Sequence, residues 1–394
     1  APVRMFFHAP TTPADWLSLE IEAPAGLAGD ELKKAKAAAD AARQKLADYL
    51  HSVLTTPNLL VLAGGGTSLG NAHGPSMADL WTKATKIQDF EAVVAAVKHP
   101  KNDIWIENLL SRCKAANEFL DNAVAASKVT KFLEASEKMI WKECSEFLAN
   151  ADLDAHRTFL RRMARRRLRA PRLKLFTTNY DLCFERAASD LGITAIDGFS
   201  FAQPRRFNPR FFHYDVVRRG KGSDDAHDFV EGVIHLFKLH GSVNWDRVGT
   251  EVVQCERPEK PCLMYPTNTK YEQSYSQPHL ELMAQFQPAL REPNTALVTI
   301  GFGFNDKHLS EHIMAAVDSN PSFKLLVVDP VAKERTGTGN GFHSTLGNKI
   351  TSGEVDIALL NANFTQFAEL IPRLRALSPA EQIERSVKQI AKES

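Results

Sequence analysis

The 394-residue sequence is poor in cysteine, and its five cysteines form no Cys-x-x-Cys pair. An odd number of thiols spread over a long chain argues against a disulfide framework. Cys255 and Cys262 are the closest pair, but two thiols would need two further ligands to make a structural zinc site. The sequence therefore predicts free thiols in a reducing compartment.

Excess charge and long apolar runs are missing as well. The chain has 48 Lys and Arg against 47 Asp and Glu, so its overall charge gives no case for nucleic-acid binding. No stretch approaches the ~20 apolar residues that cross a bilayer, and the N-terminus lacks a secretory signal pattern. We expect a soluble, cytoplasmic protein that makes no contact with a membrane.

Short apolar strands alternate with helical patterns along the chain. This alternation predicts an α/β fold with a doubly wound parallel sheet. We expect strands at 59–62, 172–179, 232–241, 295–303, 323–330 and 354–361, and loops at 198–230, 246–278 and 335–348. The domain boundaries follow: a segment and helix at 1–56, a Rossmann-like core at 57–75 plus 171–375, a helical insertion at 76–170, and a C-terminal helical tail at 376–394.

Chemically capable residues follow the expected strands directly. A glycine turn with Thr67 and Ser68 follows the first strand, and its backbone can approach a diphosphate closely, although Gly70 falls one place late for G-x-G-x-x-G. Asn179 and Asp181 follow the second strand, where Asp181 can cap the next helix. His240 ends the third. Because ligands on such sheets bind beyond the carboxyl ends of the strands, these groups should share one cleft.

These motifs resemble those of the sirtuin family (silent information regulator two). The family signature is a Gly-Ala-Gly-x-Ser turn, then Gln/Thr-Asn-x-Asp, then His-Gly, then a Gly-x-Ser-type turn. The corresponding segments here are 64–68, 178–181, 240–241 and 301–304, in family order and at strand ends. The resemblance covers roughly 57–75, 172–190 and 232–375, and it implies a core that binds NAD.

Two departures separate the chain from the protein-deacylating sirtuins. It lacks their two zinc-binding Cys-x-x-Cys pairs, and "HGPSMADLW" at 73–81 replaces their Gly-Ile-Pro-Asp-Phe-Arg loop. It looks instead like the sirtuin-like domains of bacterial anti-phage defence proteins, which carry a helical insertion and hydrolyse NAD to nicotinamide and ADP-ribose. That resemblance implies NAD as the substrate, no metal, a homo-oligomer, abortive infection by NAD depletion, and a possible HerA-type ATPase partner. NAD-dependent protein deacylation and a nucleotide-sensing subunit without turnover remain alternatives.

The resemblance also assigns roles. His240 would act as the base, and Asn179 would orient the water and the ribose. Asp181 would support the nicotinamide-side loop. The remaining NAD-binding residues would be Gly64, Gly66, Thr67 and Ser68 on the diphosphate, and Gly301, Phe302, Gly303 and Asp329 with Phe304 on the adenosine half.

Two further patterns compete with this interpretation. "HLSEH" at 308–312 has a metal-ligand spacing, but the sirtuin resemblance already accounts for the segment, so we expect no metal there. The basic run 157–174 could bind phosphates of nucleic acid or of acidic lipid, or form a subunit interface. Its apolar residues recur at helical spacing, which favours an amphipathic helix with a solvated basic face.

Overall fold

The computed structural model describes residues 4–8, 16–21, 29–117, 120, 122–164, 166, 170–218, 228–263, 278–339, 341–353 and 355–372. The helical tail expected at 376–394 lies outside this part of the chain. Within it, no helix is both long enough and apolar enough to span a bilayer.

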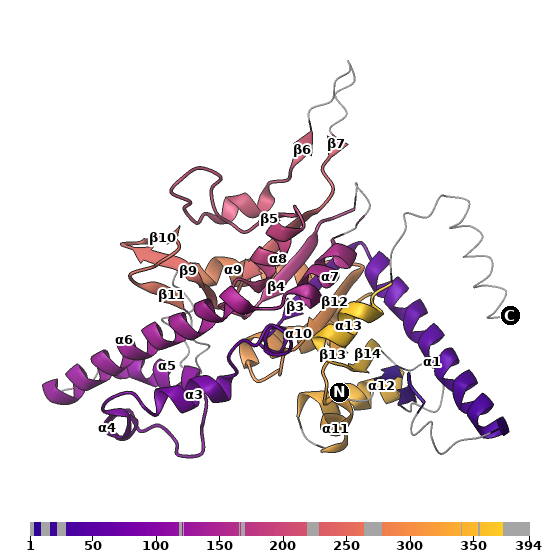
Figure 1. The fold of residues 1–394 in the computed structure, drawn as a ribbon, viewed down its shortest axis with the longest axis horizontal. Helices are drawn as coiled ribbons and strands as arrows, with labels where there is room; N and C mark the ends of the chain where they lie inside the picture. Colours follow the sequence, from indigo (N-terminus) through magenta and orange to yellow (C-terminus); the bar gives the residue numbers. More distant parts are fainter. Residues whose placement is uncertain are drawn as a thin grey trace.

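A nine-stranded sheet organises the molecule, in the order β2-β1-β14-β13-β12-β3-β4-β8-β5 (Figure 1). Neighbouring strands from β14 to β5 are parallel, whereas β1 runs antiparallel to β14 and β2 antiparallel to β1. The predicted doubly wound parallel sheet is confirmed. Its strands are β1 (Met5–His8), β2 (Leu17–Ser18), β3 (Asn58–Ala63), β4 (Leu173–Thr177), β5 (Thr194–Ile196), β8 (Val233–Lys238), β12 (Thr295–Ile300), β13 (Lys324–Val328) and β14 (Asp356–Asn361).

The chain reverses its direction of travel across the sheet between β3 and β12. From β3 it proceeds through β4 to β8 on one side, and it later returns to add β12, β13 and β14 on the other. Both faces of the sheet are covered, and each has its own apolar cluster. The covering helices are α1 (Gly29–Thr55), α7 (Asp154–Met163), α8 (Cys183–Asp190), α9 (His279–Arg291), α10 (Lys307–Ser319), α11 (Ala332–Gly337), α12 (Phe342–Ser352) and α13 (Phe364–Leu370).

Four helices between β3 and β4 form a separate lobe, which projects from the sheet in Figure 1. They are α3 (Met77–Ala84), α4 (Phe90–Ala96), α5 (Ile106–Ala116) and α6 (Ala123–Glu146), and the short 3-10 helix η2 (Phe147–Asn150) follows α6. Their apolar cluster also includes Tyr180, Val243 and Leu263 from the core. The last helix of the segment 76–170, α7, packs instead against α8 and α13. The lobe of α3–α6 therefore rests on the loop that follows β4 and on the strands β9 (Gly241–Val248) and β11 (Pro261–Leu263).

The prediction of loops at 198–230, 246–278 and 335–348 was partly wrong, because each segment contains helices or strands. Segment 246–278 includes parts of a three-stranded antiparallel sheet formed by β9 (Gly241–Val248), β10 (Glu251–Gln254) and β11 (Pro261–Leu263). The Gly-rich 335–348 is largely helical, because α11 and α12 bury Ala332 and Leu346 against the sheet. Segment 198–230 contains η3 (Pro209–His213), β6 (Val217–Arg218) and β7 (Asp228–Phe229). It is not only a surface excursion, because Phe212 stacks on Phe237 with ring centroids 4.3 Å apart.

Two arginines of the basic run, Arg162 and Arg166, stabilise the fold. The helix expected over 157–174 ends at Met163. Arg162 donates to the carbonyls of Ala368 and Ile371 at the end of α13, and Arg166 donates to the carbonyl of Thr56 after α1. These guanidinium groups bind carbonyl oxygens that the helix ends leave without an intrahelical partner.

Candidate active site

Two glycine turns touch each other where the sheet reverses. The backbone N–H of Gly64 donates to Ile300 O at 2.9 Å, and that of Gly66 donates to Gly301 O at 3.0 Å. A Cβ on Gly66 would lie 2.6 Å from Gly301 Cα, and Gly301 has a φ of +59°. Side chains are therefore excluded from this contact, which joins the ends of β3 and β12 backbone to backbone.

Asn179 is bonded directly to the glycine turn. Its Nδ2 donates to Thr67 Oγ1 and to Ser68 Oγ, both at 3.0 Å, and its backbone N–H donates to Thr177 Oγ1 at 3.1 Å. Both amide hydrogens are thereby used, which fixes the orientation of the amide group. Across the described residues, no hydrogen bond reaches its Oδ1. The structure thus brings Asn179, Thr67 and Ser68 together, as the shared edge of the strands predicts.

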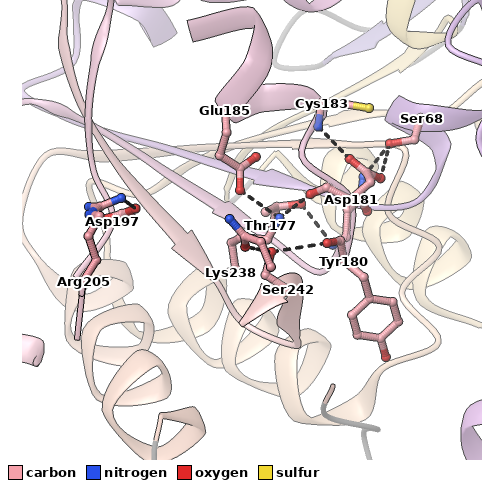
Figure 2. A network of polar contacts seen from close by, with 12 residues as sticks. Ser68, Thr177, Tyr180, Asp181, Cys183, Glu185, Asp197, Arg205, Lys238 and Ser242 are labelled. Carbon is pink, nitrogen blue, oxygen red and sulfur yellow. Dashed lines mark hydrogen bonds and ion pairs between the residues drawn. The ribbon is translucent and has the colours of Figure 1, made fainter. Parts of the chain in front are cut away.

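Asp181 completes this hydrogen-bonded group, and Figure 2 shows its surroundings. Its Oδ2 accepts from Ser68 Oγ at 2.7 Å, and its Oδ1 accepts from the backbone N–H of Cys183 at 3.0 Å. The second bond satisfies the first N–H of α8, but Asp181 is not the N-cap of this helix as predicted, because Leu182 occupies that position.

A buried lysine lies directly behind this group. Lys238, on β8, donates to the backbone carbonyl of Asp181 and pairs with Glu185 Oε1 at 2.9 Å (Figure 2). Burial raises the pKa of Glu185, although the charge of Lys238 opposes that shift. Sequence reasoning did not single out Lys238. A single lysine inside the apolar run "HLFKLHG" is the signal that could have found it.

His240 follows β8 and is buried against a carboxylate from the other half of the sheet. Its Nε2 lies 3.0 Å from Asp306 Oδ2, and both side chains are less than 10% exposed. Burial lowers the pKa of His240. The hydrogen bond to Asp306 and the charges of Asp306 and Glu107 outweigh burial, so the pKa is raised. Burial acts in the opposite direction on Asp306, where the contact with His240 keeps the pKa of the carboxyl lowered. Asp306 was not among the predicted site residues.

The helical lobe contributes a second carboxylate near His240. Glu107, in α5, accepts a hydrogen bond from the hydroxyl of Tyr180 at 2.8 Å, and the ring of Tyr180 lies 6.5 Å from that of His240 between centroids. Burial raises the pKa of Glu107, and the charge of His240 opposes this. The lobe is therefore electrostatically coupled to the candidate base.

The predicted residues take part in two hydrogen-bonded groups, one around Asn179 and one around His240. Asn179 and His240 make no hydrogen bond to each other among the described contacts, although their strands are neighbours and Leu239 N donates to Thr177 O at 2.8 Å. Gly301 lies in the glycine contact. Phe302 and Gly303 follow it, and the ring of Phe302 packs against that of Phe304 at 5.0 Å.

The carboxylate of Asp329, which directly follows β13, already has partners within the protein. It accepts from Val331 N at 2.9 Å and forms an ion pair with Arg335 at 2.7 Å, and its Oδ2 lies 3.1 Å from His343 Nε2. Burial raises its pKa, but these contacts outweigh burial and leave the pKa lowered. Asp329 follows β13 at the same edge of the sheet as Gly301–Gly303, the other residues predicted to bind the adenosine half.

A cavity of about 240 Å³ lies beside the glycine contact. Gly66, Thr67 and Gly301 line it together with Val328 and Ala362 from the ends of β13 and β14. It does not include Phe302, Gly303 or Asp329. The predicted adenosine residues therefore only partly coincide with this cavity.

The pattern "HLSEH" lies on α10. His312 Nε2 is 2.7 Å from the amide nitrogen of Gln287. In the part of the chain that the structure describes, no group of three or more His, Cys, Asp or Glu side chains is placed to hold a metal ion.

A comparison with models of protein families finds a match in the region that contains Asn179 and His240. Residues 173–336 match the model of the SIR2-like domain. The SIR2-like match runs from the start of β4 into α11, so it includes Asn179, His240 and Asp306 and leaves out the glycine turn and the helical lobe. It supports a sirtuin-like domain on three of the four motifs, those at 178–181, 240–241 and 301–304. No match was found among the curated proteins.

Two solved structures of a Sir2 homologue, each in complex with ADP-ribose, are similar to this chain. One is a histidine-to-asparagine mutant and the other a serine-to-alanine mutant, with TM-scores of 0.38 and 0.37. Both are 13% identical to this chain, and each comparison covers 78% of this chain and 95% of the other.

Proposed function

We propose that this protein is an NAD⁺ hydrolase that cleaves NAD⁺ to nicotinamide and ADP-ribose. The observation that carries this proposal is the hydrogen-bonded group of Asn179, Thr67 and Ser68. It lies against the glycine contact of a SIR2-like domain, and the adjacent strand ends at the buried His240.

The chemistry suits these side chains. Nicotinamide leaves NAD⁺ as a neutral molecule, so the glycosidic bond needs orientation and charge stabilisation rather than a strong acid. Asn179 would use its remaining Oδ1 to orient the ribose or the attacking water. His240 would accept the proton that this water loses. The reaction consumes NAD⁺ and water, and it yields nicotinamide, ADP-ribose and a proton.

Two features around the glycine turn support binding of the diphosphate and the adenosine half of NAD⁺ there. A Cβ on Gly65 would meet no atom within 4 Å, so the outer side of the turn is open to a ligand. The adjoining cavity beside Gly66 and Gly301 offers apolar walls from Val328 and Ala362. Polar groups near one end and apolar walls at the other are typical of nucleotide sites.

Deacylation is the second candidate, and one observation counts against it. The zinc module of protein-deacylating sirtuins requires two Cys-x-x-Cys pairs, and the sequence has no such pair. After His240 the described chain forms the small sheet of β9, β10 and β11 instead.

The cellular role that follows is defence against phage by depletion of NAD⁺ in the cytoplasm. By the resemblance to defence proteins, the chain would work as a homo-oligomer and with a HerA-type ATPase. A nucleotide-sensing subunit would share the site but release no nicotinamide.

An NAD⁺-consumption assay tests the proposal, run with and without a HerA-type ATPase encoded beside the gene. We expect nicotinamide and ADP-ribose in equal amounts from the wild type and none from Asn179→Ala or His240→Ala. Asn102→Ala, at an exposed position on the lobe, is the matched control and should retain full turnover. Full turnover by both active-site variants would sink the proposal. Binding of NAD⁺ without nicotinamide release would indicate a sensor, and consumption only with an acyl-lysine peptide would indicate a deacylase.

A further inference from the structure

The pair of His240 and Asp306 joins the two halves of the sheet across the candidate site. His240 comes from β8, whereas Asp306 precedes α10 after β12, and the two atoms Nε2 and Oδ2 are 3.0 Å apart. The glycine turn and Asn179 belong to the strands between them, β3 and β4. The contact therefore depends on the complete sheet rather than on either half.

The carboxylate of Asp306 is held in one orientation. Its Oδ1 accepts the backbone N–H of His308 at 2.9 Å, as the N-cap of α10. An ionised carboxylate can only accept hydrogen bonds, so the Oδ2 that faces His240 requires the proton to be on Nε2. The lone pair of a neutral His240 is then on Nδ1, and no hydrogen bond from a described residue reaches this nitrogen.

Building on the proposed NAD⁺ hydrolysis, we propose that Asp306 is a positioning residue for His240. It holds the imidazole as the Nε2–H tautomer, so that Nδ1 presents its lone pair to the reacting water or ribose hydroxyl. The attacking water forms the new C1′–O bond as the bond from C1′ to nicotinamide breaks. The electron pair of that bond goes to the nicotinamide nitrogen, and the water proton goes to Nδ1. Asp306 then faces the imidazolium and stabilises it.

Other charged and titratable groups face His240 from the surrounding elements. Glu107 lies on α5 and His279 at the start of α9, and His308 on α10 acts on Asp306, the partner of His240. Tyr180 packs near the ring from the loop after β4. His279 Nδ1 is bonded to Leu239 O at 3.0 Å, and burial lowers the pKa of His279. The negative charges of Asp306 and Glu107 therefore have the larger effect on the imidazole, in agreement with the raised pKa of His240.

Asp306→Asn is the informative variant, because asparagine caps helices as well as aspartate does. The cap requires an oxygen toward the N–H of His308, which turns the amide NH₂ toward His240. Nε2 must then accept, and the proton moves to Nδ1, where it blocks the base. General-base catalysis contributes about 10²–10⁴-fold, so we expect kcat to fall at least about tenfold, with little change in KM for NAD⁺. Loss of the negative charge also lowers the pKa of His240, so the acid limb of the pH–rate profile should move to lower pH.

Two further variants complete the test. Asp306→Ala removes the cap and the partner together, and it should lose both stability and kcat. Asp318→Asn removes one charge from the same helix, where Asp318 pairs with Lys349 at 2.5 Å, and it should behave as the wild type. If Asp306→Asn keeps the wild-type kcat and acid limb, or turns over NAD⁺ faster than the wild type, Asp306 does not position the base.

A readout that needs no NAD⁺ cleavage separates this inference from the proposed function. The ¹⁵N chemical shifts of the His240 ring distinguish the two neutral tautomers. We expect Nε2–H in the wild type and Nδ1–H in Asp306→Asn. A wild type that shows these shifts but releases no nicotinamide would overturn only the proposed function. An Nδ1–H tautomer in the wild type would overturn the inference.

Discussion

Lys238 and Glu185 form an ion pair directly behind the turn that carries Asn179. The Lys238 Nζ lies 2.9 Å from Glu185 Oε1 and also binds the backbone carbonyl of Asp181 (Figure 2). The lysine side chain is 3% exposed and the glutamate side chain 23%. One ammonium group thus ties β8 to the β4–α8 turn, and the placement of Asn179 depends on it.

Replacement of Lys238 by methionine should destabilise the protein strongly. Lys238→Met keeps the length of the side chain but leaves Glu185 without its counter-charge in a largely buried position. Removal of one partner from a buried pair costs about 3–5 kcal/mol in the free energy of unfolding. Urea denaturation at neutral pH measures the loss.

A double variant identifies the cause of that loss. Lys238→Met with Glu185→Gln removes both charges, so it should recover part of the lost stability. The pKa of Glu185 is already raised, and without Lys238 its carboxyl should bind a proton at still higher pH. The deficit of the single variant should therefore shrink as the pH falls. A deficit that is independent of pH and equal in the double variant would show that packing, not charge, explains it.

The sequence was sufficient to predict the sheet edge that holds the site. The apolar runs before Gly64, Asn179 and His240 are short and buried on both faces, which marks parallel strands, and the carboxyl ends of such strands share one edge. The hydrogen bonds from Asn179 to Thr67 and Ser68 confirm that this edge brings the two motifs together. Local pattern was enough here because each motif directly follows its own strand.

Partners supplied by distant segments could not be predicted. Asp306 is 66 residues from His240, and Glu107 is 73 residues from Tyr180, so no spacing rule links either pair. The helical lobe was predicted from its few glycines and prolines and from the helical spacing of its apolar residues. Its docking on β9 depends on tertiary contacts such as the bond from Trp141 Nε1 to Val243 O at 2.9 Å. Residue pairs of this kind become visible only when the fold is known.

Substitutions in the two glycine turns should distinguish a glycine that is needed for packing, Gly301, from one that is needed for ligand binding, Gly65. Gly301→Ala places a Cβ 2.7 Å from the backbone of Gly66 at a φ of +59°, so it should cost at least about 2 kcal/mol of stability. Gly65→Ala meets no atom within 4 Å and should change stability by less than about 0.5 kcal/mol. If the diphosphate approaches there, Gly65→Ala should raise KM for NAD⁺. Thermal unfolding and NAD⁺ kinetics test both, and equal losses of stability would contradict the argument.

Glu107, on the helical lobe, should help to set the pKa of His240. Glu107→Gln keeps an acceptor for the Tyr180 hydroxyl and removes a negative charge that helps to raise the pKa of His240. The neutral imidazole is the base, so a lower pKa should shift the acid limb of the pH–rate profile to lower pH. The shift should be smaller than that of Asp306→Asn, because Asp306 contacts the ring directly. Tyr180→Phe removes the hydrogen bond and keeps the charge, so a larger shift in that variant would show that orientation matters more than charge.

His156 should make the protein sensitive to mild acid. Its ring lies edge-on to Phe184 and Phe364, at centroid distances of 5.0 and 4.8 Å, and neither ring nitrogen has a hydrogen-bond partner among the described residues. Burial lowers the pKa of His156 to about 4 from an ordinary value of 6.5. Between these two values the unfolded chain binds a proton that the folded chain excludes. The contribution of His156 to stability should therefore be full above pH 6.5 and fall as the pH drops toward 4, by about 3 kcal/mol for this residue alone.

The variant His156→Leu removes this proton uptake, and its stability should fall less steeply between pH 6.5 and pH 4 than that of the wild type. Burial also lowers the pKa of His235 to about 4, so the single variant should keep part of the slope, and His156→Leu with His235→Leu should lose most of it. Urea denaturation at several pH values gives each slope. Equal slopes in the wild type and both variants would show that the buried rings are protonated without loss of the fold.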